Sequence, residues 1–155
     1  MLCPGGRRKW ETMNIKRYLV GAGAGVLTVG LTAFGAAAAR PLTVQAAVSG
    51  GTLTVTGTAR SDAIALRLAP GASNTLQVDA GDDGTAEFSF DRTTFTQVQV
   101  LARAGNDRIR IDQVNGAFAD EATTLNGGRG NDTILGGDGN ESLLGQSGND
   151  SVDGN

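Results

Sequence analysis

A nine-residue repeat near the carboxyl end restricts the fold of this chain more than any other feature of its sequence. Residues 127–153 divide into three consecutive segments, GGRGNDTIL, GGDGNESLL and GQSGNDSVD. Each segment keeps a central glycine, an acidic residue two positions later, and a large aliphatic residue two positions after that. These residues are Gly130, Gly139 and Gly148, then Asp132, Glu141 and Asp150, and finally Ile134, Leu143 and Val152. Such a period predicts short units that bury their apolar side chains by stacking on one another.

The two halves of each repeat have different chemistry. The glycine-rich half can turn sharply, through conformations closed to other residues, and so expose backbone carbonyls. The acid at the end of the turn supplies a hard anionic oxygen, and Ca²⁺ takes about six to eight oxygen ligands at roughly 2.3–2.6 Å. The remaining residues predict a short strand that points one aliphatic side chain inward. The pattern therefore predicts a calcium-binding repeat.

These three units resemble the RTX, or haemolysin-type, calcium-binding repeat of secreted bacterial proteins, including those of actinobacterial type. The resemblance implies a parallel β-roll, a β-solenoid in which two nine-residue units make one coil and turns eighteen residues apart share ions. It pairs the turn at 127–132 with the turn at 145–150. Asp132 and Asp150 are then expected to flank one ion, and backbone carbonyls are expected to complete its shell.

The resemblance gives a set of expected calcium ligands. The set comprises Asp132, Asp150, Glu141, Gly128, Gly130, Gly137, Gly139, Gly148 and Asp107. Glu141 is one methylene longer than the usual aspartate and is expected at the opposite edge, and Gln146 replaces a glycine where a positive φ is expected. Asp107 belongs to a weaker echo of the repeat, AGNDRI, and a further echo, GTARSDAI, places Asp62 where it is expected to cap a strand or turn.

The region before the repeats predicts short β-strands. Apolar and polar residues alternate, or β-branched residues predominate, in 42–48, 52–57, 63–68, 75–79, 85–90, 95–102 and 107–112. The acidic stretch 79–87 lacks the spacing of an EF-hand loop and predicts a solvated hairpin turn. The chain is therefore expected to be all-β. The pattern leaves open whether 41–112 forms a separate sandwich or the first coils of one solenoid.

The amino-terminal segment predicts a targeting signal. Lys16 and Arg17 precede an uncharged apolar stretch, and small residues at 36–39 offer a cleavage site before Arg40. A membrane anchor is the alternative, although the stretch is rich in Gly and Ala. We expect an extension and signal peptide at 1–39, a β-rich region at 40–125 and the calcium-binding repeats at 126–155. The predicted location is extracellular, and Met13 is the expected start.

The charge of residues 40–155 excludes several kinds of partner. This part carries eight arginines, no lysine and fifteen acidic residues. A negative surface repels nucleic acid and anionic lipid and attracts cations, so we expect calcium ions but no nucleic acid and no membrane insertion after cleavage. The alternative for the acidic, glycine-rich tail is disorder, which is also the state expected without calcium.

Composition also bears on catalysis. The chain has no histidine and no HExxH or GxSxG motif, so a Ser-His-Asp catalytic triad and a His-ligated zinc site are excluded. We expect a secreted, non-enzymatic calcium-binding protein that folds on binding its ions, with an unknown cell-surface or matrix partner. The alternative is a non-catalytic fragment of a secreted hydrolase, adhesin or cytolysin. Because the repeats stop at Gly154 and Asn155, truncation of a longer product is expected.

Overall fold

A computed structural model describes residues 43–155, which form an all-β structure with one short 3-10 helix. The strands lie close to the segments expected from the sequence. They are β1 (Gln45–Ser49), β2 (Thr52–Thr56), β3 (Ala63–Ala69), β4 (Ala72–Ala80), β5 (Phe88–Asp91), β6 (Gln97–Leu101), β7 (Arg108–Asp112), β8 (Ala122–Arg129), β9 (Thr133–Leu135), β10 (Glu141–Ser147) and β11 (Ser151–Asp153), with helix η1 at Arg92–Thr94. The all-β expectation is confirmed for this part of the chain.

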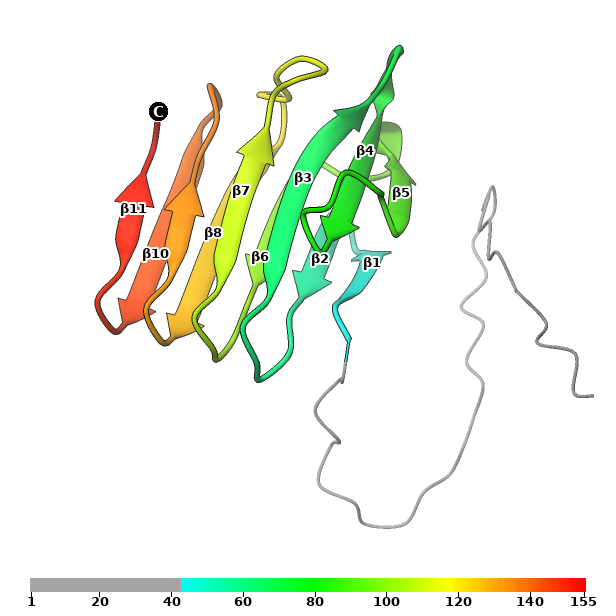
Figure 1. Ribbon diagram of the computed structural model, residues 1–155. Helices are drawn as coiled ribbons and strands as arrows, with labels where there is room; N and C mark the ends of the chain where they lie inside the picture. Colours follow the sequence, from blue (N-terminus) through cyan, green and yellow to red (C-terminus); the bar gives the residue numbers. More distant parts are fainter. Residues whose placement is uncertain (1–42) are drawn as a thin grey trace, which may run out of the picture. The chain divides into compact units, whose positions relative to one another are not determined.

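The strands form two sheets, and most of the chain alternates between them (Figure 1). One sheet has the order β1-β2-β6-β8-β10, and the other has the order β11-β9-β7-β3-β4-β5. Four successive pairs, each with one strand in either sheet, are joined by a tight turn at the same edge, the lower edge in Figure 1. We call these pairs, with their turns, rungs 1 to 4: β2–β3, β6–β7, β8–β9 and β10–β11.

Neighbouring rungs pair in parallel, but their spacing along the sequence changes. Gln97 lies opposite Thr52, 45 residues away, and Ala122 lies opposite Gln97, 25 residues away. Glu141 lies opposite Thr123, at the 18-residue spacing of two nine-residue units. The strands of 43–112 therefore belong to the same two sheets as the repeat strands and do not form a separate sandwich.

Both sheets are mixed, so a purely parallel β-roll is not the architecture of the described chain. β1 pairs with β2 antiparallel, and β3, β4 and β5 form an antiparallel meander. The reason is local: the turns at Gly50–Gly51 and Gly71 have positive φ and close two-stranded hairpins. Parallel pairing between rungs needs a longer return path, which the loops between rungs supply.

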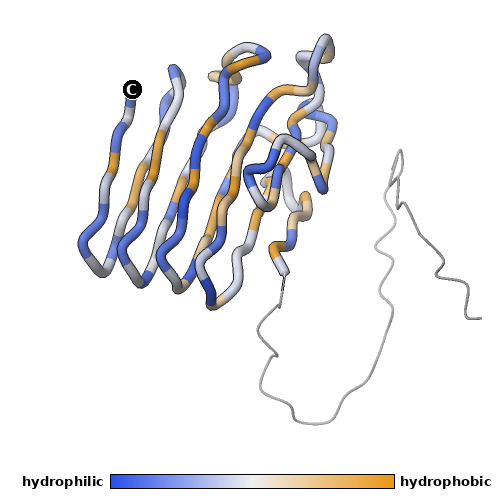
Figure 2. Tube along the Cα trace, in the orientation of Figure 1, coloured by the Kyte–Doolittle hydropathy of each residue, from blue (hydrophilic) through white to orange (hydrophobic). Residues whose placement is uncertain are grey.

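The core lies between the two sheets. Alternate residues of β2, β6, β7 and β8 point inward and are buried, and Leu53 and Val55 on β2 and Ile109 on β7 are completely buried. Figure 2 shows the resulting alternation of apolar and polar residues along the strands. Rung 4 is less buried: Leu143, opposite Leu125, is only partly buried, and Val152, opposite Ile134, is 48% exposed.

The acidic stretch 79–87 connects the antiparallel strands β4 and β5, and most of residues 81–87 are exposed, as expected of a solvated hairpin turn, but its first acid is not solvated. Asp79 is fully buried and forms an ion pair with Arg67, at 2.7 Å between Oδ2 and Nη1. Although burial raises the pKa of Asp79, hydrogen bonds from Arg67 and from the backbone of Gly84 and Asp83 hold it below its usual value. Part of the stretch thus packs onto the protein, because Asp79 pairs with Arg67 and Asp82 pairs with Arg110, both distant in sequence.

The predicted signal peptide, its alternative as an anchor, and the expected start at Met13 lie outside the described residues. Within residues 43–155, no helix has the length and apolar character needed to cross a membrane.

Candidate metal centre

Four turns with an aspartate at the same position lie side by side at one edge of the two sheets. Each turn links the two strands of one rung and ends in Asp62, Asp107, Asp132 or Asp150. The turns are residues 57–62, 102–107, 127–132 and 145–150. We call this edge the aspartate edge; Figure 2 shows hydrophilic residues in its turns.

The aspartates of successive turns form a ladder of hydrogen bonds. The backbone N–H of Asp62 donates to Oδ1 of Asp107 at 2.7 Å, and that of Asp107 donates to Oδ1 of Asp132 at 2.8 Å. The N–H of Asp132 donates in the same way to Oδ1 of Asp150, at 2.9 Å. One oxygen of each downstream carboxylate is therefore fixed by the preceding rung.

The second oxygen of the two central aspartates has no partner among the described residues. Asp107 and Asp132 are 2% and 1% exposed, and Oδ2 of each is buried without a hydrogen bond. The pKa of Asp107 is raised to about 6, mainly by burial and also by the neighbouring charges of Asp132 and Asp62, against the hydrogen bond from the N–H of Asp62. A buried anionic oxygen without a partner is costly, so it favours either a proton or a cation.

Glycines bring the backbones of successive turns into close contact. Gly130 and Gly148 have φ of +128° and +141°, and a Cβ on either would overlap the carbonyl oxygen of the equivalent residue in the preceding turn, Gly105 or Gly130. Gly128 also has a positive φ, and a Cβ there would overlap the carbonyl oxygen of Arg103. Backbone carbonyls therefore line the gap between neighbouring turns, where hard oxygen ligands are needed.

The position expected to be glycine at residue 146 adopts the strained conformation with a larger side chain. Gln146 has φ of +76°, and Arg103, which occupies the equivalent place in rung 2, has φ of +84°. The reduced freedom expected for Gln146 therefore does not prevent the left-handed turn. Backbone strain of this kind is typical of functional sites.

Asparagine side chains form a second ladder outside the aspartates. The N–H of Asn131 donates to Oδ1 of Asn106, and the N–H of Asn149 donates to Oδ1 of Asn131, both at 2.9 Å. In rung 1, Ser61 takes this place and accepts from the N–H of Asn106 at 3.1 Å. The geometry that the turns share thus rests on hydrogen bonds from backbone N–H groups of one rung to side chains of the preceding rung.

Rung 1 satisfies its aspartate without any external group. Oδ2 of Asp62 accepts from the N–H of Thr58 at 2.7 Å, and the Thr58 hydroxyl lies 3.1 Å from both carboxylate oxygens. This is the turn cap expected for Asp62. Because Thr58 replaces the glycine of rung 3, the turn of rung 1 is closed by its own residues.

The remaining expected ligands lie at the opposite edge. Glu141 begins β10, and its Oε1 accepts from the N–H of Gly139 at 3.1 Å. A Cβ on Gly137 would approach Ile111 and Gln113, and one on Gly139 would approach Ala119. The structure thus separates Glu141, Gly137 and Gly139 from the aspartate edge, as the sequence predicted for Glu141.

Sequence reasoning missed that Asp62, Asp107 and Asp132 form one ladder. Each echo of the repeat was visible, but the spacings of 45 and 25 residues hide their alignment. The signal that was available is the shared aspartate followed two positions later by isoleucine, at Ile64, Ile109 and Ile134. Within the described residues, no three acidic, cysteine or histidine side chains gather as a metal cluster, so any ion here would depend on backbone carbonyls as well.

The geometry defines a class of protein in which stacked glycine–aspartate turns present oxygen ligands along one edge. Residues 120–152 match the family model of the RTX calcium-binding nonapeptide repeat. This segment of the chain therefore carries RTX-type calcium-binding repeats, which supports a calcium-binding function. No curated protein and no solved structure matched the chain.

Proposed function

We propose that this protein is a secreted, non-catalytic calcium-binding protein whose repeats fold into a β-roll when calcium binds between their turns. The observation that carries the proposal is the pair of buried oxygens without partners, Oδ2 of Asp107 and Oδ2 of Asp132, in turns that match or adjoin the repeat family. A calcium ion coordinated by these oxygens neutralises their buried negative charge.

The donors fit two ions at the aspartate edge. One ion lies between rungs 2 and 3, held by the carboxylates of Asp107 and Asp132. The other lies between rungs 3 and 4, held by Asp132 and Asp150, as the resemblance to the RTX repeat implies. The carbonyls of Gly105, Gly128, Gly130 and Gly148 are the expected backbone ligands. Rung 1 takes no ion, because Thr58 already donates to both oxygens of Asp62.

Binding and folding are coupled in this proposal. Without an ion, the acids of residues 120–155 repel one another, and rung 4 buries little apolar surface to oppose that repulsion. A ligand that binds only the folded state at about a hundred times its dissociation constant adds roughly 2.7 kcal/mol of stability. Extracellular calcium modules often have dissociation constants of about 10⁻⁴–10⁻³ M, so export would place the chain where the repeats fold.

The absence of catalysis is part of the proposal. Paired carboxylates suffice for glycoside hydrolysis, and Asp120 and Glu121 lie at a surface hollow of about 330 Å³. However, both oxygens of Glu121 bind Arg92, at 2.6 and 2.8 Å, so this carboxylate is held by a guanidinium and is not free to transfer a proton.

Far-ultraviolet circular dichroism of the full chain, titrated with calcium and with magnesium, tests the proposal. We expect a calcium-specific gain of β signal, which the Asp132→Asn/Asp150→Asn double variant loses. The matched control is Asp138→Asn/Asp153→Asn, which removes the same charge from the same segment at positions outside the ladder. An equal response to calcium in both double variants would refute the assigned ligands.

A further inference from the structure

A 27-residue insertion separates rungs 1 and 2. It comprises residues 70–96, which include β4, β5 and η1. β4 pairs with β3 and β5 pairs with β4, so the insertion adds two strands beyond β3 at one end of that sheet. Two of its side chains also contact residues beyond rung 1: Asp82 contacts rung 2, and Arg92 contacts the residues just before rung 3.

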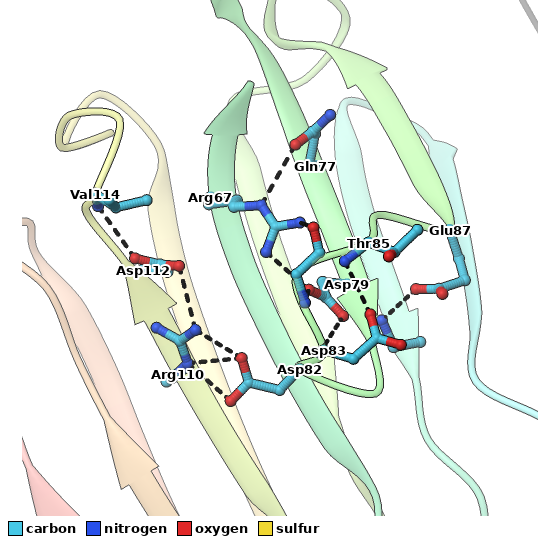
Figure 3. Close-up of polar contacts among 12 residues, drawn as sticks. Arg67, Gln77, Asp79, Asp82, Asp83, Thr85, Glu87, Arg110, Asp112 and Val114 are labelled. Carbon is cyan, nitrogen blue, oxygen red and sulfur yellow. Dashed lines mark hydrogen bonds and ion pairs between the residues drawn. The ribbon is translucent and has the colours of Figure 1, made fainter. Parts of the chain in front are cut away.

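The first contact joins the loop between β4 and β5 to rung 2. Asp82 accepts hydrogen bonds from Arg110 on β7, at 2.6 Å from Nη2 and 2.8 Å from Nε (Figure 3). It also lies 3.4 Å from Nε of Arg108. The side chain of Asp82 is 11% exposed, so the pair is largely shielded from water. Asp82 has φ of +53°, a conformation rare for residues other than glycine, which aims its carboxylate across β3.

The second contact joins η1 to the start of rung 3. Arg92 forms a bidentate pair with Glu121, which immediately precedes β8, and also lies 3.2 Å from Oδ2 of Asp120. Its Nη1 donates to the carbonyl of Ser73 at 2.8 Å, which ties the same guanidinium back to β4. Both side chains of the bidentate pair are largely buried, at 11% and 4% exposed, and such pairs are strong and geometrically specific.

The same loop is rigidly attached to rung 1. Arg67 on β3 pairs with Asp79 at the end of β4 and donates to the carbonyl of Gly84 at 2.8 Å, so the loop is anchored at its start and at its middle. Asp83, beside Asp82, accepts only a local bond from Thr85 at 2.8 Å, and no described arginine pairs with it. The contacts to rungs 2 and 3 therefore depend on particular residues and not on the general acidity of the loop.

We infer that the insertion is a calcium-independent splint that holds rungs 1 to 3 in register through Asp82–Arg110 and Arg92–Glu121. Ion pairs and buried apolar residues stabilise these rungs, whereas among the described residues no ion pair reaches β10 or β11, and Leu143 is only partly buried against the core. The splint presents rung 3 as a preformed template, and only the addition of rung 4 requires the ion. The last statement rests on the proposed function; the existence of the splint does not.

Hydrogen–deuterium exchange of the full chain, followed by mass spectrometry in chelator and in calcium, tests the inference. In chelator we expect the wild-type chain to protect β3, β4, β6 and β7 while β10 and β11 exchange freely. The Asp82→Asn variant keeps a side chain that tolerates a positive φ but loses the charge. We expect exchange of β7 about tenfold faster in chelator, because a charge-assisted pair is lost, and substantial recovery in calcium. The matched control, Asp83→Asn, should leave β7 unchanged.

The outcomes separate the splint from the calcium function. Equal exchange of β7 in the Asp82→Asn and Asp83→Asn variants, or free exchange of rungs 1 and 2 in the wild-type chain in chelator, would overturn the splint. Glu121→Gln provides a second test, since it should speed exchange at the start of β8 while Asp138→Asn does not. If calcium leaves β10 and β11 unprotected while the variants behave as expected, the splint stands and the proposed function fails.

Discussion

Rung 1 and rung 3 use the same aspartate position in opposite ways. In rung 1, Thr58 donates to both oxygens of Asp62, and the turn is complete as a hydrogen-bonded unit. In rung 3, glycine stands at the equivalent position, and Oδ2 of Asp132 is buried without a partner. Rung 1 is thus a turn closed by protein groups, with the N–H and hydroxyl of Thr58 on its aspartate, whereas the turn of rung 3 has an oxygen left for a cation.

The largest effect is expected from a substitution at the close backbone contact between the turns of rungs 2 and 3. Gly130→Ala places a Cβ against the carbonyl of Gly105 at a φ that L side chains rarely adopt, so we expect a loss of about 3 kcal/mol in the free energy of unfolding. Urea unfolding in calcium measures it. Gly71→Ala is the control, since Gly71 also has a positive φ but has open space around it. An equal loss in both variants would mean that φ alone, and not the contact between rungs, limits position 130.

The next effect should change sign with calcium. Asp132→Asn keeps the acceptor for the N–H of Asp107 but removes a buried negative charge beside Asp107. In chelator we expect the variant to be more stable than the wild-type chain by about 1–2 kcal/mol, because the buried negative charge next to Asp107 is removed. In calcium we expect it to be less stable. Thermal unfolding in both conditions tests this, with Asp138→Asn as control, and destabilisation in chelator would contradict it.

A smaller effect is expected from pH. The pKa of Asp107 rises from 3.8 to about 6 in the folded state, so the folded chain binds more protons than the unfolded chain between pH 4 and pH 6. Stability in chelator should therefore rise as pH falls from 7 to 5, by roughly 1.4 kcal/mol. The lowered pKa values of Asp79 and Asp91 act below pH 4, with the opposite sign.

Asp107→Asn is the control for the pH effect. Urea unfolding at pH 5 and pH 7 should show no proton-linked gain in this variant, whereas the wild-type chain shows it in chelator. In calcium the dependence should reverse for the wild-type chain, because protons compete with the ion for the same carboxylates. A loss of stability of the wild-type chain in chelator between pH 7 and pH 5 would contradict the raised pKa of Asp107.

The smallest effect concerns the strained turn of rung 4. Gln146→Gly removes the cost of a left-handed conformation at φ of +76°, so we expect a gain of about 0.5–1 kcal/mol in calcium. Ser147→Gly, at the next position, has no positive φ to relieve and should not stabilise the chain. Urea unfolding compares the two, and a gain in both variants would point to a general effect of glycine in β10.

The strands and the repeat turns could be predicted from the sequence because both signals are local. Alternating residues such as those of 52–57 and 107–112 have a period of two that only a strand uses, and β2 and β7 lie within those ranges. The pairing of Asp132 with Asp150 followed from the resemblance to the RTX repeat, which implies that turns eighteen residues apart stack. The alignment of Asp62 and Asp107 with them did not, since the insertion 70–96 and the loop 113–121 change the spacing between rungs.

The sequence by itself determined that residues 43–155 are all-β and that the repeats can supply oxygen ligands, because periodicity and residue chemistry are properties of short segments. Only the tertiary structure decided which carboxylates lack partners. Whether Oδ2 of Asp132 is buried, or whether Asp82 meets Arg110, depends on segments 18 to 45 residues apart being brought together. Burial and long-range pairing are set by the packing of all the rungs, and no local pattern encodes them.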